Sequence, residues 1–326
     1  MLFRSDARTL IRLANETPSP HVTLYWGELA SAGGIDRAKD LGAHGVGGDL
    51  FIDGSLGSRT ALITQPYEDD PANVGVQYLS DGEVTDHIRS CTVAEIPTGF
   101  HVIGDAACSQ VTTAFASVAS ELGATRLCPL RHRIEHAEML TNTQIRTLAG
   151  FGITFSMQPL FDALWGSPSG MYVERLGRSR ARQMNRFHDV IQSGGRLALG
   201  SDSPVTPMEP WSSVEAALTH YQPQQRLNFR QALTAHTQAA WQSIGEDRAG
   251  RLAVGHDAHL AIWQTPESWP SNNISNWLAT SSDASMSREK TEERDRELPL
   301  SSLRCQMTVR DGECVYGFDF WTDRAS

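Results

Sequence analysis

The chain has 326 residues and a formal net charge of −10, from 28 basic and 38 acidic residues. The hydrophobic fraction of 40% and the charged fraction of 20% are ordinary for a folded globular protein, and the length suits either one large β/α barrel or two ordinary domains. Because the net charge would repel phosphate backbones and anionic membrane surfaces, it argues against nucleic-acid and membrane binding.

The cysteines and the N-terminal residues indicate the cellular compartment of the protein. The five cysteines form no CxxC pair and are odd in number, which fits neither a disulfide framework nor a cysteine-based zinc site. No apolar run approaches the roughly 20 residues that cross a bilayer, and residues 1–20 lack the apolar core of a signal peptide. We therefore expect a reducing, cytoplasmic setting.

Short β-type runs alternate with helical patterns through the first three quarters of the chain, which is typical of βα units and a parallel sheet. Helical spacing of apolar residues predicts helices over 106–123, 141–152, 182–195, 211–221 and 228–244. Asp105 stands where the N-cap of the first of these helices would lie. The expected strands are VTLYW (22–26), GDLFID (48–53), GFHVIG (99–104), RHRIEHA (131–137), GITFSMQ (152–158) and GRLALGSD (195–202).

The C-terminal quarter has a different pattern. Residues 251–264 alternate like a strand, and 303–318 form two alternating runs around Asp311-Gly312, a strong hairpin signal. Between them, residues 265–300 are polar and resemble a surface insertion. We therefore expect a small β structure over 251–326, appended to an α/β domain over 1–250.

Three of the expected strands end or turn at a residue type that binds metals: His101, His136 and Asp202. A single histidine near a strand end is more often an ordinary packing or surface residue. These three, however, occupy equivalent positions in separate βα units, and the functional residues of β/α barrels lie at the C-terminal ends of the strands. Two imidazoles and a carboxylate suit zinc or a similar divalent ion.

Strand periodicity adds further acidic candidates. A period of two places His101, Ile103 and Asp105 on one face of a strand, and Asp49 and Asp53 on one face of another. Asp105 could accept a hydrogen bond from the ring nitrogen of a ligand imidazole that does not bind the metal. We favour the other interpretation, in which Asp105 caps the helix.

The glycine-rich segment over residues 45–60 contains neither GxxxxGK[ST] nor GxGxxG between a strand and a helix, which disfavours a nucleotide site. One interpretation is a loop over the pocket mouth, where Ser58 or Arg59 holds a substrate carbonyl or carboxylate. The other is a tight turn that needs Gly54 and Gly57 for positive φ. No GxSxG motif is present, which disfavours a serine hydrolase.

Six further segments occur in a definite order along the chain: DLFIDGSLGSRTA (49–61), FHVIGDAA (100–107), RIEHAE (133–138), FSMQP (155–159), LGSDSPV (199–205) and ALTAHT (232–237). In order and approximate spacing they resemble the amidohydrolase 3 group of the amidohydrolase superfamily, which includes N-substituted formamide deformylases. The resemblance runs from about residue 20 to the C-terminus and implies a (β/α)8 TIM-type barrel with a small β-sandwich. It also implies metal-dependent hydrolysis of carbon–nitrogen bonds other than peptide bonds, in small amide or formamide substrates.

The resemblance assigns roles to individual residues. His101, His136 and Asp202 correspond to metal ligands, with Asp202 also carrying the proton from water to the leaving nitrogen. Asp49 occupies the position where many relatives have a metal-bridging lysine, so it is either a ligand or a substrate contact. We also expect Asp53 and Arg59 to contact the substrate.

Two departures from the family pattern shape the expected fold. The family has an HxH pair after its first barrel strand, and no HxH occurs in this sequence. The first strand here resembles the family's third, so we expect an N-terminally truncated, incomplete barrel. Its open edges favour pairing with another copy, which makes a homo-oligomer an alternative to a monomer. The competing hypothesis for function is an inactive barrel that serves as a binding or oligomerising module.

Overall fold

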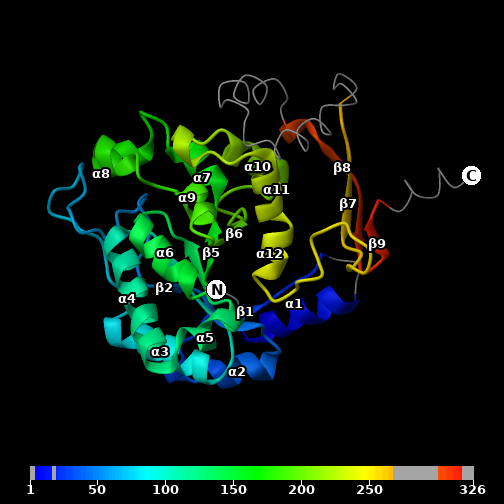
Figure 1. The fold of residues 1–326 in the computed structure, drawn as a ribbon, viewed down its shortest axis with the longest axis horizontal. Helices are drawn as coiled ribbons and strands as arrows, with labels where there is room; N and C mark the ends of the chain where they lie inside the picture. The colour runs from blue at the N-terminus through cyan, green and yellow to red at the C-terminus, as the bar shows by residue number, and fades with distance from the viewer. Residues whose placement is uncertain (1–3, 17–19, 267–299, 318–326) are drawn as a thin grey trace, which may run out of the picture.

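The computed structural model describes residues 4–16, 20–266 and 300–317, and within them it places two separate sheets (Figure 1). One is a parallel sheet of six strands in the order β1 to β6, and the other is antiparallel, in the order β7-β8-β9. The expected α/β fold with a parallel sheet is therefore confirmed. The strands are β1 (Tyr25–Trp26), β2 (Gly45–Phe51), β3 (Thr98–Val102), β4 (Arg133–His136), β5 (Thr154–Met157), β6 (Arg196–Leu199), β7 (Leu260–Gln264), β8 (Arg304–Arg310) and β9 (Glu313–Tyr316).

Each strand of the large sheet pairs in parallel with the next one along the chain, as in a β/α barrel. Strands β1 and β6 form its two edges, and within the described ranges they do not pair with each other. No helix in the described ranges is long and apolar enough to cross a bilayer. The helices are α1 (Arg4–Glu16), α2 (Gly34–Leu41), α3 (Asp81–Val93), α4 (Asp105–Leu122), α5 (Ala124–Leu127), α6 (Asn142–Gly150), α7 (Pro159–Trp165), α8 (Met171–Ala181), α9 (Phe187–Gln192), α10 (Pro210–Leu218), α11 (Phe229–His236) and α12 (Gln238–Gln242).

Several expected bounds were wrong. Strand β6 ends at Leu199, so Asp202 lies beyond it in a turn. The single helix expected over 228–244 is two helices, because Thr237 has φ −120° and ψ −91° between them. Only the last part of 251–264 is a strand, and nearly all of the polar insertion expected over 265–300 lies outside the described residues.

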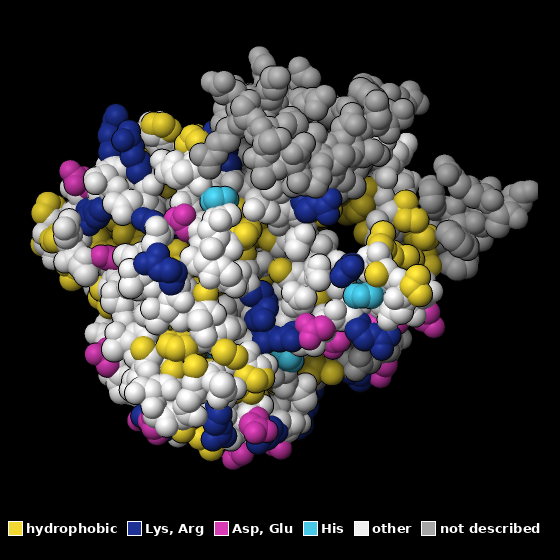
Figure 2. Space-filling view, viewed as in Figure 1, with side chains coloured by type: hydrophobic (Ala, Val, Ile, Leu, Met, Phe, Trp, Pro, Cys, Tyr) yellow, Lys and Arg dark blue, Asp and Glu magenta, His cyan; other side chains and the backbone are white. Residues whose placement is uncertain are grey.

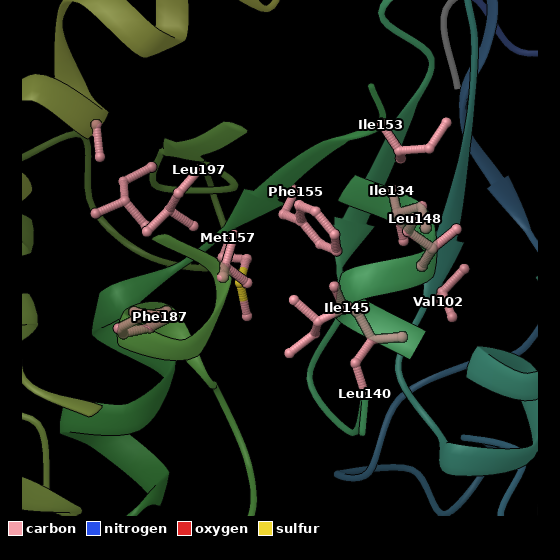
Figure 3. Close-up of a cluster of buried hydrophobic side chains, with 14 of the residues drawn as sticks. Val102, Ile134, Leu140, Ile145, Leu148, Ile153, Phe155, Met157, Phe187 and Leu197 are labelled. Atoms are coloured by element: carbon pink, nitrogen blue, oxygen red, sulfur yellow. The ribbon is translucent and has the colours of Figure 1, made fainter. Parts of the chain in front are cut away.

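The apolar core lies between one face of the parallel sheet and the helices that cover it (Figure 3). Alternate residues of the strands, including Phe100, Ile134 and Phe155, are fully buried there against residues of α4 and α6. Burying each such side chain contributes about 1.5–3 kcal/mol. The side chains at the intervening positions, such as Arg133 and Glu135, point to the opposite face of the sheet, the inner face. The apolar face therefore anchors the strands, and the inner face carries polar side chains.

Two buried histidines connect α3 to the sheet. His87 accepts the Ala30 N–H at Nδ1 (2.9 Å) and donates from Nε2 to the Thr98 hydroxyl (2.7 Å). His132 accepts the Thr98 N–H at Nδ1 (3.0 Å) and donates from Nε2 to the Thr92 hydroxyl (3.2 Å). Because each ring has one accepting and one donating nitrogen, both imidazoles are held in the neutral form.

The glycine-rich segment over 45–60 contains a turn at residues 56–59, which agrees with one of the two interpretations offered for it. Gly54 and Gly57 do not have positive φ, whereas Gly48 in β2 has φ 81°. A side chain on Gly48 would come within 2.8 Å of the Tyr25 Cβ, and one on Gly54 would collide with the Thr60 hydroxyl. Positive φ was therefore the wrong reason for glycine at positions 54 and 57. At position 54, close packing rather than backbone conformation requires glycine.

The expected hairpin around Asp311-Gly312 is confirmed as β8 and β9, with β7 beside β8. This small sheet lies on one side of the α/β body, beyond α11 and α12 (Figure 1). Trp263 of β7 meets Trp211 of α10 edge-to-face, with ring centroids 5.7 Å apart. Leu303, just before β8, belongs to the main core cluster. The small sheet therefore packs against the body through apolar side chains.

Candidate metal centre

Three neighbouring strands bring Asp49, His101 and His136 together at one end of the parallel sheet. One ligand atom from each residue lies within 4.8 Å of the others. The Asp49 Oδ1 atom is 3.4 Å from His101 Nδ1 and 3.9 Å from His136 Nε2. The strand register explains the grouping, since β2, β3 and β4 are adjacent and all run toward this end.

Both imidazoles are oriented by a hydrogen bond on the nitrogen that faces away from the cluster. His101 Nε2 lies 3.2 Å from the Gly54 carbonyl oxygen, and His136 Nδ1 lies 2.8 Å from Gln158 Oε1. Because carbonyl and amide oxygens can only accept, these nitrogens carry the hydrogens. The opposite nitrogens, His101 Nδ1 and His136 Nε2, therefore face the Asp49 carboxylate. In a neutral ring this nitrogen carries the lone pair, and in protonated His101 it donates a hydrogen bond to Asp49.

Aromatic contacts hold the same two rings from the side. The ring of Phe51 lies 4.5 Å from that of His101, and Phe161 of α7 stacks on His136 at 5.7 Å with 10° between the planes. The His101 and His136 ring centroids are 4.4 Å apart. His101 and His136 are buried, whereas the Asp49 side chain is 55% exposed. The cluster is thus fixed on the protein side and open on the other.

The electrostatics of the cluster show opposed effects. Burial lowers the pKa of His101, but the hydrogen bond and charge of Asp49 outweigh burial and leave that pKa raised. Burial and the neighbouring His101 lower the pKa of His136 to about 4. For Asp49, burial raises the pKa, yet His101 and the other cationic neighbours bring it below its usual value. A positive charge at this point would therefore satisfy all three groups.

Asp202 lies near the cluster but outside the closely spaced group. It is exposed, has φ 53°, and sits in the turn after β6. Partial desolvation by its surroundings and the negative charges of Asp49 and Glu135 raise the pKa of Asp202 to about 6. The structure thus places Asp202 where its charge interacts with Asp49, without bringing its carboxylate into the group of ligand atoms.

Asp53, expected to contact the substrate, is fully buried. One carboxylate oxygen accepts the Ile103 N–H (3.0 Å), and the other accepts the N–H groups of Leu62 (2.9 Å) and Gly104 (2.7 Å). Burial raises the pKa of Asp53 to about 6, against the lowering effect of these bonds. Asp53 therefore clamps the loop after β2 to the end of β3.

Arg59 and Asp105 make contacts away from the cluster. The Arg59 guanidinium forms two hydrogen bonds to Asp69, of 2.7 and 3.2 Å. Asp105 is the first residue of α4 rather than its N-cap, which is Gly104, and its side chain makes no cap hydrogen bond, so the capping prediction was wrong. Its carboxylate accepts the Thr64 N–H (2.9 Å) and hydroxyl, which ties the loop after β2 to α4.

Sequence reasoning missed Gln158 and Arg133, which support the site. Gln158 follows β5 directly, so the strand-end rule that selected His101 and His136 would also have found it. Arg133 and Glu135 form an ion pair on the inner face of β4, and Arg133 Nη2 also donates to the Ser156 hydroxyl (2.9 Å). Arg133 and Glu135 are two positions apart, which places them on one face of a strand. Only the fold shows that they lie beside the cluster.

Comparison with known proteins gives the lineage. The sequence pattern of the Amidohydrolase family matches residues 4–316. The Bacillus subtilis (strain 168) protein named "Putative amidohydrolase YtcJ" is 30% identical over 225 residues, which cover 65% of this chain and 41% of that protein. The Arabidopsis thaliana Protein LONG AFTER FAR-RED 3 is 31% identical over 229 residues, which cover 67% of this chain and 38% of that protein. The chain therefore spans about two fifths of these curated relatives.

Solved structures agree with this assignment. An uncharacterized metal-dependent hydrolase from Pyrococcus furiosus matches with a TM-score of 0.64 and 26% identity, over 77% of this chain and 52% of the other. A fold match at this identity supports the sequence match, and the family pattern covers nearly the whole chain. The chain belongs to the Amidohydrolase family.

Proposed function

We propose that the protein is a metal-dependent hydrolase that acts on carbon–nitrogen bonds other than peptide bonds. One observation carries the proposal: the inward nitrogens of two oriented imidazoles and a carboxylate oxygen lie within 4.8 Å of one another. Such an arrangement is repulsive unless a proton or a metal ion lies between the groups. It is the donor set that zinc and similar divalent ions bind.

The residues present fit such an ion. His101 Nδ1, His136 Nε2 and Asp49 would hold it, and Asp202 is a second carboxylate nearby. When bound, a divalent ion lowers the pKa of a water molecule and polarises a substrate carbonyl. Asp202, exposed beside the cluster, is the group that we propose takes the proton from water and returns it to the leaving nitrogen. Gln158 and the Gly54 carbonyl keep the imidazoles in the required tautomers.

An apolar wall beside the site favours an amide with an apolar or aromatic substituent. Phe51 and Tyr78 are 49% and 50% exposed, and their ring centroids are 6.4 Å apart. Phe51 also contacts His101, so a substrate group on these rings would lie next to the cluster. With the resemblance to the formamide deformylases, this points to N-substituted formamides and related small amides as substrates.

The first test is metal content. Purified protein dialysed against zinc should retain the ion by elemental analysis, and His101→Ala and His136→Ala should each lose most of it. Asp202→Ala should retain more metal than either histidine variant but show no turnover of N-substituted formamides. His188→Ala, a histidine outside the cluster, is the control. Full metal retention by both histidine variants would overturn the site.

A second candidate is an inactive barrel that acts as a binding or oligomerising module. Two observations favour it: the sequence has no HxH pair, and the sheet edges β1 and β6 are not joined within the described residues. Edge strands with free backbone groups can pair with another chain. A well-folded, metal-loaded protein that hydrolyses no member of an amide and formamide panel, and elutes as a dimer, would favour this alternative.

A further inference from the structure

A small cavity lies beside α8 and the end of α7. It measures about 60 Å³, and its wall includes Arg178, Arg182, Tyr221 and Gln222 together with the apolar side chain of Val173. Gly166, which ends α7, also lines it. Phe161 of the same helix stacks on His136 of the candidate metal centre.

The arginines of this region divide into two groups. The segment from 175 to 186 carries arginine at five positions in a chain of net charge −10. Figure 2 shows dark blue side chains gathered over the α8 end of the molecule. Three of the five are engaged by protein groups: Arg175 with Asp69 and Glu174, Arg180 with the carbonyls of Leu176, Gln65 and Pro66, and Arg186 with Asn142, Gln183 and Asp189.

The other two arginines are those that line the cavity. Arg178 and Arg182 are four positions apart, so they lie on one side of the α8 end. Among the described residues, their guanidinium groups make no hydrogen bond or ion pair. Like charges at this spacing repel each other. Both side chains are exposed, so the cavity presents two solvated guanidinium groups that have no partner among the described residues.

The remaining polar groups of the cavity are held in place. The Tyr221 N–H donates to Asp162 Oδ2 (2.9 Å), and the Gln222 N–H donates to His220 Nδ1 (2.9 Å). These backbone bonds fix the segment that carries the tyrosine hydroxyl and the glutamine amide. Both groups can donate hydrogen bonds to an anion.

We propose that this cavity binds a small oxyanion, a carboxylate or a phosphate group, between Arg178 and Arg182. The volume of about 60 Å³ is roughly four to six times the minimum needed for one water molecule, which suits a single oxyanion group. A guanidinium donates two parallel hydrogen bonds to such a group, which gives it both charge and geometry to recognise it. Tyr221 and Gln222 supply further donors.

The test uses the metal-free full-length protein, so its outcome does not depend on the proposed hydrolase activity. Inorganic phosphate and succinate are titrated separately by calorimetry at constant ionic strength, with chloride as the reference salt. We expect saturable binding of at least one of them at one site per chain. Preference for phosphate or for succinate identifies which oxyanion the cavity takes.

Matched variants locate the binding. Arg178→Gln with Arg182→Gln should weaken the Kd at least tenfold, and Arg178→Lys with Arg182→Lys should weaken it less, because charge remains while the bidentate geometry is lost. The control, Arg126→Gln with Arg146→Gln, removes the same charge from exposed positions on α5 and α6 and should bind like the wild type. Circular dichroism checks that each variant is folded. Equal affinity in the glutamine pair, or no saturable binding to the wild type, would refute the proposal.

Discussion

Each imidazole of the candidate metal centre has one hydrogen bond that helps to orient it, and for His136 the partner is a side chain that can be changed. Gln158→Leu removes the acceptor at 2.8 Å from His136 Nδ1 while keeping a side chain of similar size. Because such partners fix the tautomer and ring direction, we expect zinc affinity to fall about 10–100-fold. Competition with a chromogenic chelator measures it.

The control for this prediction is Gln192→Leu. Gln192 also contacts a histidine, His188, at 3.4 Å, but on the exposed surface. It should leave zinc affinity unchanged. Equal zinc affinity in Gln158→Leu and the wild type would mean that packing by Phe161, rather than the hydrogen bond, orients His136.

The buried Asp53 carboxylate should contribute mainly to stability. Asp53→Asn replaces one accepting oxygen with an NH₂ group, which would face the N–H groups that the carboxylate now accepts. Since each buried donor left without an acceptor costs about 1–3 kcal/mol, we expect a loss of roughly that size or more in urea unfolding. Asp86→Asn, at an exposed surface ion pair, should change stability by less than about 1 kcal/mol. Similar losses in both variants would contradict the clamp.

At the residue scale, sequence could identify strand-end residues but not their partners. His101 and His136 were found because a strand-end position is a local property. Which of the acidic candidates would join them depends on strand register and turn geometry. Asp49 is brought in by β2, whereas Asp53, four positions later, turns into the protein. No local pattern distinguishes these two aspartates.

The element-scale feature with the clearest pH signature is the connection of α3 to the sheet through His87 and His132. Burial lowers the pKa of His87 to about 4 and that of His132 to about 3. In the unfolded chain a histidine titrates near about 6.5. Between about pH 6.5 and 4, therefore, the unfolded state binds protons that these two residues cannot accept in the folded state, and the free energy of unfolding falls as the pH falls.

Each of these histidines should contribute a slope of up to about 1.4 kcal/mol per pH unit in that window. Buried acids, such as Glu138, whose pKa burial raises to about 7, contribute with the opposite sign, so the test compares variants rather than absolute curves. His132→Gln should be less stable at pH 7 but should show a shallower decline from pH 6.5 to 4 in urea unfolding. His188→Gln controls for loss of a surface histidine. A His132→Gln curve parallel to the wild-type curve would refute the assignment.

The βα alternation was predictable because hydrophobic periodicity is local, and the six strands appear in the expected order. The ends of the elements were less predictable because tertiary contacts determine them. The helix pattern over 228–244 is continuous in sequence, yet the chain bends at Thr237, where Gly250 packs so closely that a side chain on it would meet Thr237 and Gln238. Because Gly250 and Thr237 are far apart in the sequence, their contact leaves no periodic signal in it.

At the scale of the whole molecule, the parallel sheet has one apolar and one polar face. The apolar face is covered by helices, whereas the inner face carries Arg133, Glu135 and Arg196 together with the metal centre. Burying charged side chains is costly unless they are paired or solvated. Arg133 pairs with Glu135, and Arg196 donates to the Gly152 carbonyl and to the Thr154 hydroxyl, both at 3.2 Å. The inner face is therefore suited to holding ions and polar substrates rather than to forming a dry core.

The relation of the small sheet to the body can be tested through Leu303. This residue is 6% exposed and belongs to the same apolar cluster as Phe229 and Leu218 of the α/β body. Leu303→Ala should cost about 2–5 kcal/mol through lost burial and the cavity left behind. If 251–326 folds as part of one cooperative unit, calorimetry should show a single transition at lower Tm. Leu252→Ala, at a position 83% exposed, should leave the Tm nearly unchanged. Two resolved transitions in Leu303→Ala, with only the smaller one shifted, would instead identify the C-terminal sheet as an independent domain.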